Sequence, residues 1–196
     1  NKMVLTYTDS SRYSDEINED NWLDIITCPD IKVGASDPNK DPCGYRSLMV
    51  LALTYLQKGD IRAMEMLERV GAVETDGDSI LIDVSQGIPE GTGNFVFRDK
   101  SVDLIALLES GVLDYAFEYK NVALQHGLKY VELPKEVDLS APELDDLYGR
   151  VLVKVLGSGG DVITLRAMSI TYGLTIPDVA ENVEEAKKFI ELLVSD

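Results

Sequence analysis

Short apolar stretches separated by polar and turn-forming residues recur along the whole chain. Stretches that are rich in β-branched residues, or that alternate between apolar and polar positions, predict strands, whereas longer amphipathic stretches predict helices. The expected strands are 2–7, 31–35, 79–84, 94–98, 113–119, 129–133, 151–156 and 168–176. The expected helices are short turns within 13–28, then 45–58, 61–70, 102–108, 121–126 and 183–194, with a polar connector over 138–149.

Several residues mark where the helices begin and end. Asp20, Asp60 and Ser101 are expected N-caps, because their short polar side chains accept hydrogen bonds from the first helical turn. Gly59 and Gly71 follow expected helices and favour the left-handed conformation that ends them. The alternation of helix and strand predicts an α/β layer fold with a largely parallel sheet.

The segment between the expected strand at 31–35 and the expected helix at 45–58 reads SDPNKDPCGYR. Asp and Pro predict a turn here and Gly44 opens the helix, so a strand leads directly into a helix N-terminus. The first N–H groups of a helix lack intrahelical partners, and the helix dipole adds about half a positive charge, so this position favours anions. Asp41 is the unusual residue, because it places an acid at the entrance of an anion site.

Composition bounds the class of protein. With 196 residues, 45% of them hydrophobic and 27% charged, the chain is expected to fold as one or two compact domains. The 35 acids and 18 bases give a net charge of −17, which excludes nucleic acid as a partner because phosphate backbones require basic surface. The two cysteines, Cys28 and Cys43, are too few to define a disulfide framework, and their spacing leaves open whether they are bridged.

The chain shows no pattern typical of a membrane span. No run of about 18 apolar residues occurs in it. It begins at Asn1 without a basic or apolar leader segment, so we expect any export signal or lipid anchor to have been removed or to lie outside this sequence.

Three ordered segments that together span most of the chain resemble a known family. They are SDPNKDPCGYRSLMVLAL at 36–53, LIALLESGVLDYAFEYKNVALQHGLKYVELP at 104–134 and DLYGRV at 146–151. These segments resemble the archaeal-type tungstate/molybdate-binding proteins, the extracytoplasmic solute-binding components of ABC importers. The resemblance implies a periplasmic-binding-protein type II-like α/β fold, in which two lobes joined by crossover strands clamp an oxyanion.

The resemblance also implies how the chain is divided. Residues 1–30 would form the end of lobe one and a crossover, and residues 31–149 would form lobe two with the DPCGYR and FEY motifs. Residues 150–196 would form the return crossover with a C-terminal strand and helix. Most of the first lobe is expected to be absent from this sequence.

A binding site follows from the resemblance, residue by residue. Asp41 and Glu118 would supply carboxylate oxygens that coordinate the metal centre of the oxyanion directly. The backbone N–H groups of Cys43 and Ser101 would donate to its oxo groups, and Tyr119 would reach the bound anion. The implied ligand is molybdate or tungstate with no cofactor, and the implied partner is an ABC transporter permease. The resemblance thus implies an extracytoplasmic binding protein, held at a membrane only by an anchor or the permease, and not an enzyme.

Two acids beside a dianion require a physical explanation. At about 4 Å and an effective dielectric of about 20, each pair of like charges repels by roughly 4 kcal/mol, so carboxylates that touch oxo groups would abolish binding. A Mo(VI) or W(VI) centre instead accepts hard oxygen ligands, which sulfate and phosphate cannot do. Carboxylates would therefore select metal oxyanions and repel the others. A protonated Asp41 or Glu118 that donates to an oxo group also fits the sequence.

The same residues fit other roles. Cys43 at a helix N-terminus fits a nucleophile, with His126 as its base, in an enzyme of the same architecture. An effector-binding domain of a transcription regulator is a further alternative, which a helix-turn-helix segment would support. Arg46 fits either an oxyanion contact or a salt bridge to Asp37 or Asp41.

The expected strand at 113–119 carries two tyrosines and an acid. Tyr115 and Tyr119 share one face because side chains alternate along a strand, and Tyr115 is expected in the core. Glu118 ends an apolar stretch, where an acid is either a solvated cap or a ligand at the carboxyl edge of the sheet.

Overall fold

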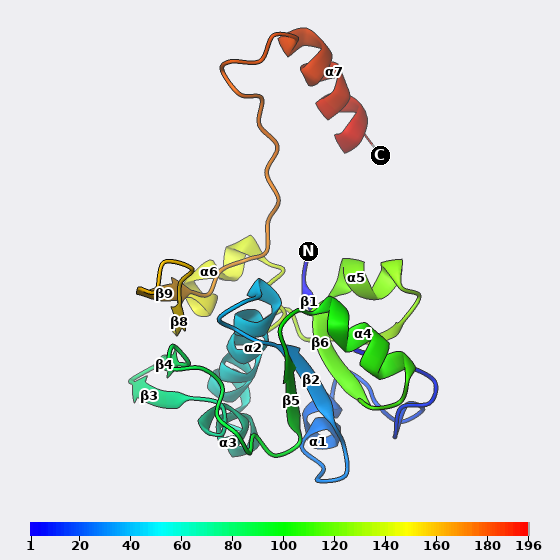
Figure 1. Cartoon of the computed structure of the whole chain (residues 1–196), viewed down its shortest axis with the longest axis vertical. Coiled ribbons are helices and arrows are strands. Elements are labelled where there is room, and N and C mark those ends of the chain that lie inside the picture. Colours follow the sequence, from blue (N-terminus) through cyan, green and yellow to red (C-terminus); the bar gives the residue numbers. More distant parts are fainter. Residues whose placement is uncertain (196) are drawn as a thin grey trace.

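The computed structural model describes residues 1–195 (Figure 1). Its strands are β1 (Met3–Tyr7), β2 (Val33–Ser36), β3 (Ala72–Asp76), β4 (Ser79–Asp83), β5 (Phe95–Arg98), β6 (Tyr115–Tyr119), β7 (Lys129–Glu132), β8 (Val151–Leu156) and β9 (Val162–Arg166). Its helices are α1 (Trp22–Ile26), α2 (Pro42–Lys58), α3 (Ile61–Glu68), α4 (Val102–Glu109), α5 (Lys120–Gln125), the 3-10 helix η1 (Pro142–Leu144), α6 (Asp145–Tyr148) and α7 (Val183–Val194). The α/β class expected from the sequence is confirmed.

The strands form two sheets, and both contain mixed directions. The five-stranded sheet has the order β5-β2-β6-β1-β7, and the four-stranded sheet has the order β3-β4-β8-β9. In the first sheet β2 runs parallel to β5 and β6, whereas β1 runs antiparallel to β6 and β7. The expectation of a largely parallel sheet is therefore wrong. The antiparallel pairings are those of β1, which lies between β6 and β7 in this sheet.

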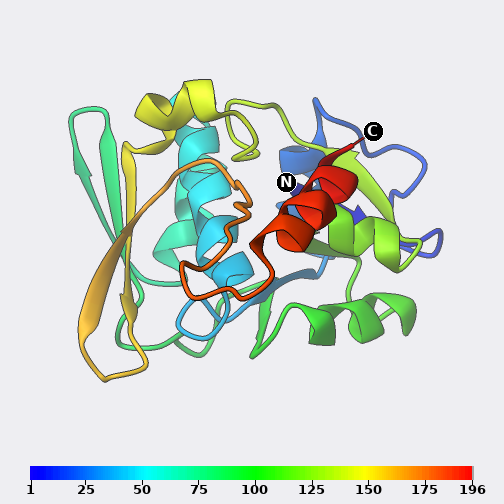
Figure 2. The same ribbon diagram turned by 90° about the horizontal axis from the view of Figure 1, so that it is seen from above.

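Helix α2 passes between the two sheets (Figure 2). It contacts β2 and β6 of the first sheet and β8 of the second. Its residues 47–54 are buried on every side of the helix, as the uninterrupted apolar stretch at 48–53 predicts. This helix is consequently the centre of the main hydrophobic core, and its N-terminus is held firmly at one edge of the first sheet.

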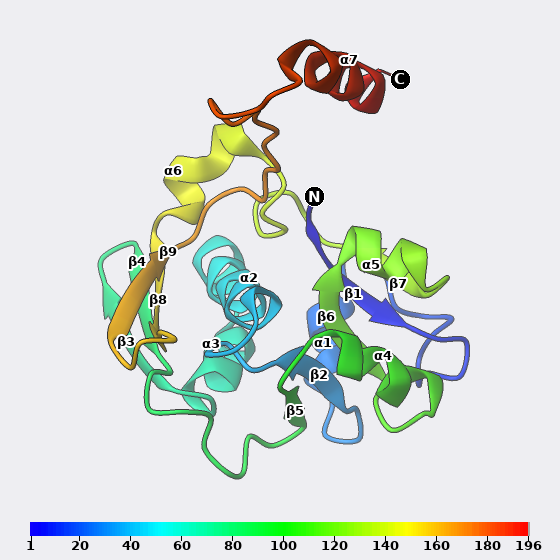
Figure 3. The same cartoon turned by 45° about the horizontal axis from the view of Figure 1, so that its top comes forward.

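Helices α4 and α5 pack on the first sheet as well (Figure 3). A separate cluster joins Leu104 and Leu108 of α4 to Leu113 and Ala116. Because side chains alternate along β6, Ala116 faces α4 while Phe117 faces the main core. The first sheet is thus covered on both faces, and its strand ends are the natural place for a ligand.

Strand pairing joins all three segments into which the resemblance divides the chain. β1 pairs with β6 and β7, which belong to 31–149, and β8 pairs with β4 of the same segment. How 1–30, 31–149 and 150–196 divide between two lobes stays a prediction.

The structure adds strands that the hydrophobic pattern did not predict. Both β3 and β9 are mostly exposed; β3 is largely polar, whereas β9 carries the exposed apolar residues Val162 and Ile163, so neither has a buried apolar face. β3 forms a hairpin with β4 around Gly77, whose φ of 57° fits the Asp-Gly turn signal in the sequence. The expected strand at 168–176 is wrong, since these residues have no ladder partner, and the expected connector at 138–149 contains η1 and α6.

The expected helix caps are confirmed in part. Asp60 accepts a hydrogen bond from the N–H of Arg62 at 3.0 Å and caps α3. The cap position of α1 is Asn21 rather than Asp20. Ser101 precedes α4 but its side chain makes no capping bond, because its backbone is already helical with φ −62° and ψ −36°.

Helix α7 stands apart from both sheets at the end of an extended segment (Figure 1). Its amphipathic pattern predicts a packing face formed by Ala186, Phe189, Ile190 and Leu193. Within the described residues this face is not covered, since Phe189 is 62% exposed and Leu193 is 57% exposed. Between residues 1 and 195 no helix has both the length and the apolar character needed to cross a membrane.

Candidate functional site

The turn between β2 and α2 is compact because a glycine lies against it. A Cβ atom on Gly44 would lie 2.2 Å from the carbonyl oxygen of Ser36 and 2.7 Å from the backbone nitrogen of Pro38. Both neighbours are backbone atoms and cannot rotate away, so only glycine fits at this position. The close contact sets the direction in which α2 leaves the sheet.

Asp41 is the N-cap of α2 and joins two helix N-termini. Its Oδ1 atom accepts a hydrogen bond from the N–H of Cys43 at 2.9 Å, which is an ordinary capping bond. Its Oδ2 atom accepts a hydrogen bond at 2.7 Å from the N–H of Ser101, directly before α4. One carboxylate therefore bonds to both of the backbone donors that the resemblance assigns to the oxyanion.

Cys43 is fully buried at the start of α2. Its thiol lies 3.5 Å from the carbonyl oxygen of Phe117 and 3.9 Å from Oε2 of Glu118. Burial, with the nearby carboxylates of Glu118 and Asp41, raises the pKa of the Cys43 thiol well above its usual value. The thiol is thus protonated and enclosed, unlike the exposed thiolate of a nucleophile. His126, its suggested base, is exposed at the end of α5.

Glu118 is completely buried near the carboxyl end of β6. Its Oε2 atom accepts a hydrogen bond from the N–H of Tyr119 at 3.1 Å, whereas its Oε1 atom has no partner among the described residues. Burial raises the pKa of Glu118 to about 7, although the N–H of Tyr119 and the Ser101 side chain oppose the shift. The alternative of a solvated strand-end acid is wrong.

Arg46 bonds to Tyr119 and not to the acids of the turn, while its contact with an oxyanion stays a prediction. Its Nη1 atom donates a hydrogen bond to the hydroxyl of Tyr119, and its guanidinium lies 5.5 Å from the centre of the Tyr119 ring. No salt bridge from Arg46 to Asp37 or Asp41 occurs among residues 1–195. Burial is the main reason why the pKa of the Tyr119 hydroxyl lies above its usual value, and the nearby Arg46 opposes this shift. The aromatic-cation pair fixes Tyr119 beside the start of α2.

All five predicted site residues are joined by direct contacts, Tyr119 through its backbone N–H to Glu118. Asp41 bonds to Cys43 and Ser101, and Cys43 contacts Glu118. The backbone N–H of Tyr119 donates to Glu118, while its hydroxyl accepts from Arg46. Tyr115 is fully buried, which confirms its expected place in the core.

Sequence reasoning missed Ser36, which belongs to the same edge of the sheet. Its hydroxyl is buried and has no hydrogen-bond partner among the described residues. Ser36 lies two residues after Gly34, whose strand partner is Ala116, and Glu118 lies two residues after Ala116. The sequence feature that could have indicated Ser36 is its position, directly after an apolar stretch and at the start of the turn. Two buried polar groups without partners thus end neighbouring parallel strands.

A cavity of about 250 Å³ adjoins Asp41. It lies between the turn at 38–42 and the end of β8, with Tyr45 also in its wall. The free cysteines Cys28 and Cys43 form no disulfide here. Within residues 1–195, no cluster of three or more His, Cys, Asp or Glu side chains is arranged to hold a metal ion.

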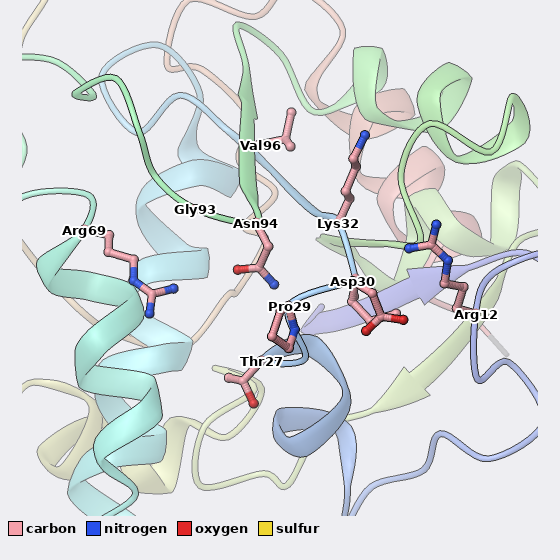
Figure 4. Close-up of a pocket in the computed structure, with 10 residues that line it drawn as sticks. Arg12, Thr27, Pro29, Asp30, Lys32, Arg69, Gly93, Asn94 and Val96 are labelled. Atoms are coloured by element: carbon pink, nitrogen blue, oxygen red, sulfur yellow. The ribbon is translucent and has the colours of Figure 1, made fainter.

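A larger cavity, of about 640 Å³, lies at another part of the molecule (Figure 4). Arg12, Lys32 and Arg69 are among the residues that line it, and Figure 4 shows Arg69 and Arg12 on opposite sides of Asn94. Lys32 precedes β2 and Asn94 precedes β5, so this cavity lies at the amino ends of these parallel strands. Asp41 follows the carboxyl end of β2, and the two features are therefore separate.

The chain belongs to the family of bacterial extracellular solute-binding proteins, which its residues 1–196 match. The mixed α/β architecture, with polar groups gathered at one edge of a sheet, agrees with this class. Among relatives, the chain is 40% identical to the molybdate/tungstate-binding protein WtpA of Pyrococcus abyssi over 198 residues. The match covers 100% of this chain and 56% of that relative.

Two further relatives match the chain at similar identity and over a similar share of their length. A solute-binding protein of Staphylothermus marinus is 40% identical over 202 residues, which cover 100% of this chain and 57% of the relative. The molybdate/tungstate-binding protein WtpA of Thermococcus kodakarensis is 38% identical over 198 residues, which cover 100% of this chain and 54% of the relative. The chain thus spans a little more than half the length of these relatives.

Proposed function

We propose that this protein binds molybdate or tungstate outside the cell and delivers it to the permease of an ABC importer. Two relatives named for molybdate and tungstate binding, at 40% and 38% identity, support the ligand. Membership of an extracellular solute-binding family supports the location and the transport role. The protein has no turnover in this proposal, because closure of lobes around the ion is sufficient for capture.

One structural observation supports the proposal most. Asp41, with its two backbone N–H contacts, and the buried Glu118 both adjoin Cys43 at the carboxyl edge of the first sheet. Backbone N–H groups suit the oxo groups of the ligand, and carboxylate oxygens suit its metal centre. In this proposal Asp41 and Glu118 coordinate molybdenum or tungsten, the N–H groups of Cys43 and Ser101 hold oxo groups, and Tyr119 lies at the side of the site.

Titration of the intact protein tests the ligand. We expect isothermal calorimetry to detect one molybdate or tungstate ion per protein, with binding of sulfate at least about 100-fold weaker under the same conditions. Sulfate has the same charge and a similar shape, so it controls for simple anion attraction. Equal affinities for all three anions, or no heat with any of them, would refute the proposed function.

The pH dependence of binding tests the role of Glu118. Its pKa of about 7 means that its carboxyl group is largely protonated near pH 6 and largely ionised near pH 8. Coordination requires the ionised form, so we expect molybdate affinity to rise about 10-fold between about pH 6 and about pH 8. The variant E118Q should lose this rise. Affinity that falls over the same range would instead support a protonated Glu118 that donates to an oxo group.

Stability of the ligand-free protein offers an independent check on the same group. Burial raises the pKa of Glu118 from 4.5 to about 7, so the folded state binds this proton more tightly than the unfolded state. The contribution of protonated Glu118 to stability is therefore complete below about pH 4.5 and is lost as the pH rises through about 7. Its size is about 3 kcal/mol, and E118Q should unfold without this dependence.

A further inference from the structure

We infer that the Asp41 carboxylate is a built-in competitor for the anion site, which a ligand must displace from the N–H groups of Cys43 and Ser101 before it can bind. This inference rests on the proposed function and adds the means by which the site rejects sulfate and phosphate. It makes Asp41 a specificity-determining residue as well as a ligand.

The Asp41 carboxylate makes the contacts that a bound anion would make at this place, because it accepts backbone N–H groups from the starts of two helices. Both carboxylate oxygens accept a backbone N–H, at 2.9 Å from Cys43 and 2.7 Å from Ser101. The first bond is an ordinary helix cap, but the second reaches across 60 positions of the chain to the start of α4. The carboxylate therefore fills the place where the N-termini of α2 and α4 meet.

A second observation at the same place points to a ligand. Oε1 of Glu118 is buried without a partner, although its other oxygen accepts the N–H of Tyr119. A buried carboxylate oxygen without a partner is costly unless something else satisfies it. Glu118 contacts Cys43, whose N–H is one of the donors that Asp41 occupies. At this edge of the sheet, the N–H donors of Cys43 and Ser101 are occupied by Asp41, while the acceptor Oε1 of Glu118 has no partner among the described residues.

Displacement of Asp41 has different consequences for different anions. With molybdate or tungstate, the displaced carboxylate coordinates the metal centre, so the bonds lost to Cys43 and Ser101 are replaced. With sulfate or phosphate, the central atom accepts no further oxygen ligand. The displaced carboxylate then remains as an unpaired negative charge beside the anion. Because the Asp41 carboxylate is part of the chain, it is always present at a high local concentration beside the two N–H groups. Free sulfate therefore competes poorly for them.

Removal of the competitor is expected to create sulfate binding. In the variant Asp41→Ala both N–H groups lose their acceptor, and sulfate affinity should rise at least about 10-fold over the unchanged protein. Asp41→Asn should show a smaller rise, because its amide oxygen still accepts one N–H while the charge is gone. Both variants should bind molybdate more weakly. Calorimetry of the intact protein with sulfate and with molybdate measures all of these affinities.

Asp60→Asn is the matched control. Asp60 caps α3 through the N–H two residues ahead, as Asp41 caps α2, and also pairs with the Arg62 side chain, but it has no contact with the candidate site. Its replacement should change neither sulfate nor molybdate affinity. If Asp41→Ala fails to fold, Asp41→Asn decides, because Asn is as good a helix cap as Asp. In ligand-free Asp41→Asn, the amide proton signal of Ser101 should also move, since it loses a charged acceptor.

The outcomes separate this inference from the proposed function. If the unchanged protein binds molybdate while folded Asp41 variants bind sulfate no better than it does, the inference is overturned and the function stands. If the unchanged protein binds neither metal oxyanion while the variants gain sulfate binding, the proposed function fails, whereas the exclusion of sulfate by Asp41 stands.

Discussion

Replacement of both site acids by amides, in D41N/E118Q, is expected to lower the affinity for molybdate and tungstate by at least about 100-fold. Each carboxylate oxygen that coordinates the metal centre contributes a bond that a neutral amide oxygen forms poorly. A loss of about 1.4 kcal/mol for each of the two ligands already gives this factor. Calorimetric titration of the intact double variant against the unchanged protein measures it.

The direction of this change is informative because simple electrostatics predicts the opposite. Removal of two negative charges near a dianion relieves repulsion of roughly 4 kcal/mol for each pair at about 4 Å, so a site that only attracts anions would bind more tightly. The variant D60N/E65Q replaces the N-cap Asp of α3 and a Glu within α3, away from the site, and should leave affinity unchanged. Molybdate affinity that is equal or higher in D41N/E118Q would show that these carboxylates do not coordinate the metal.

Gly44→Ala is expected to destabilise the protein by at least about 3 kcal/mol, at the upper end of the cost of overpacking. The added Cβ would lie 2.2 Å from the carbonyl oxygen of Ser36 and 2.8 Å from the carbonyl carbon of Asp37. These atoms belong to the turn that also holds Asp41, so the turn must open or α2 must move away. Denaturant unfolding measures the loss of stability, and the same shift should weaken molybdate binding in any protein that remains folded.

Gly173 provides the comparison for this substitution. A Cβ atom there meets nothing within 4 Å, so Gly173→Ala should change the free energy of unfolding by less than about 0.5 kcal/mol. Equal stability of Gly44→Ala and Gly173→Ala would mean that the turn is not as tightly packed as the contacts require.

Local sequence predicted most elements because their causes are local. The apolar stretch at 48–53 specifies a helix that is buried all round, and Asp60 caps the next helix through its own neighbour Arg62. β3 was missed because it is largely polar, and β9 was missed although Val162 and Ile163 are apolar; both strands are exposed and are held by their ladder partners. The stretch at 168–176 failed for the converse reason, since its β-rich composition finds no partner strand.

The candidate site divides in the same way. The motif around Asp41 and the acid at position 118 were found from sequence, because their residue types and the resemblance indicate oxyanion chemistry. The bond between Asp41 and the N–H of Ser101, and the unpartnered hydroxyl of Ser36, could not be found, because they depend on which strands lie side by side. The bond from Arg46 to Tyr119 was not predicted, because Arg46 lies in α2 and Tyr119 lies in β6, 73 positions further along the chain.

The sequence by itself determined the strongly acidic character of this protein, its helices with their turns, and the motifs that indicate its family. Only the tertiary structure decided the mixed direction of the first sheet, the complete burial of Glu118 and the two donors held by Asp41. Helix formation and capping depend on residues a few positions apart. Strand order, burial and the pKa of a buried acid depend instead on the packing of the whole chain, which no short stretch of sequence contains.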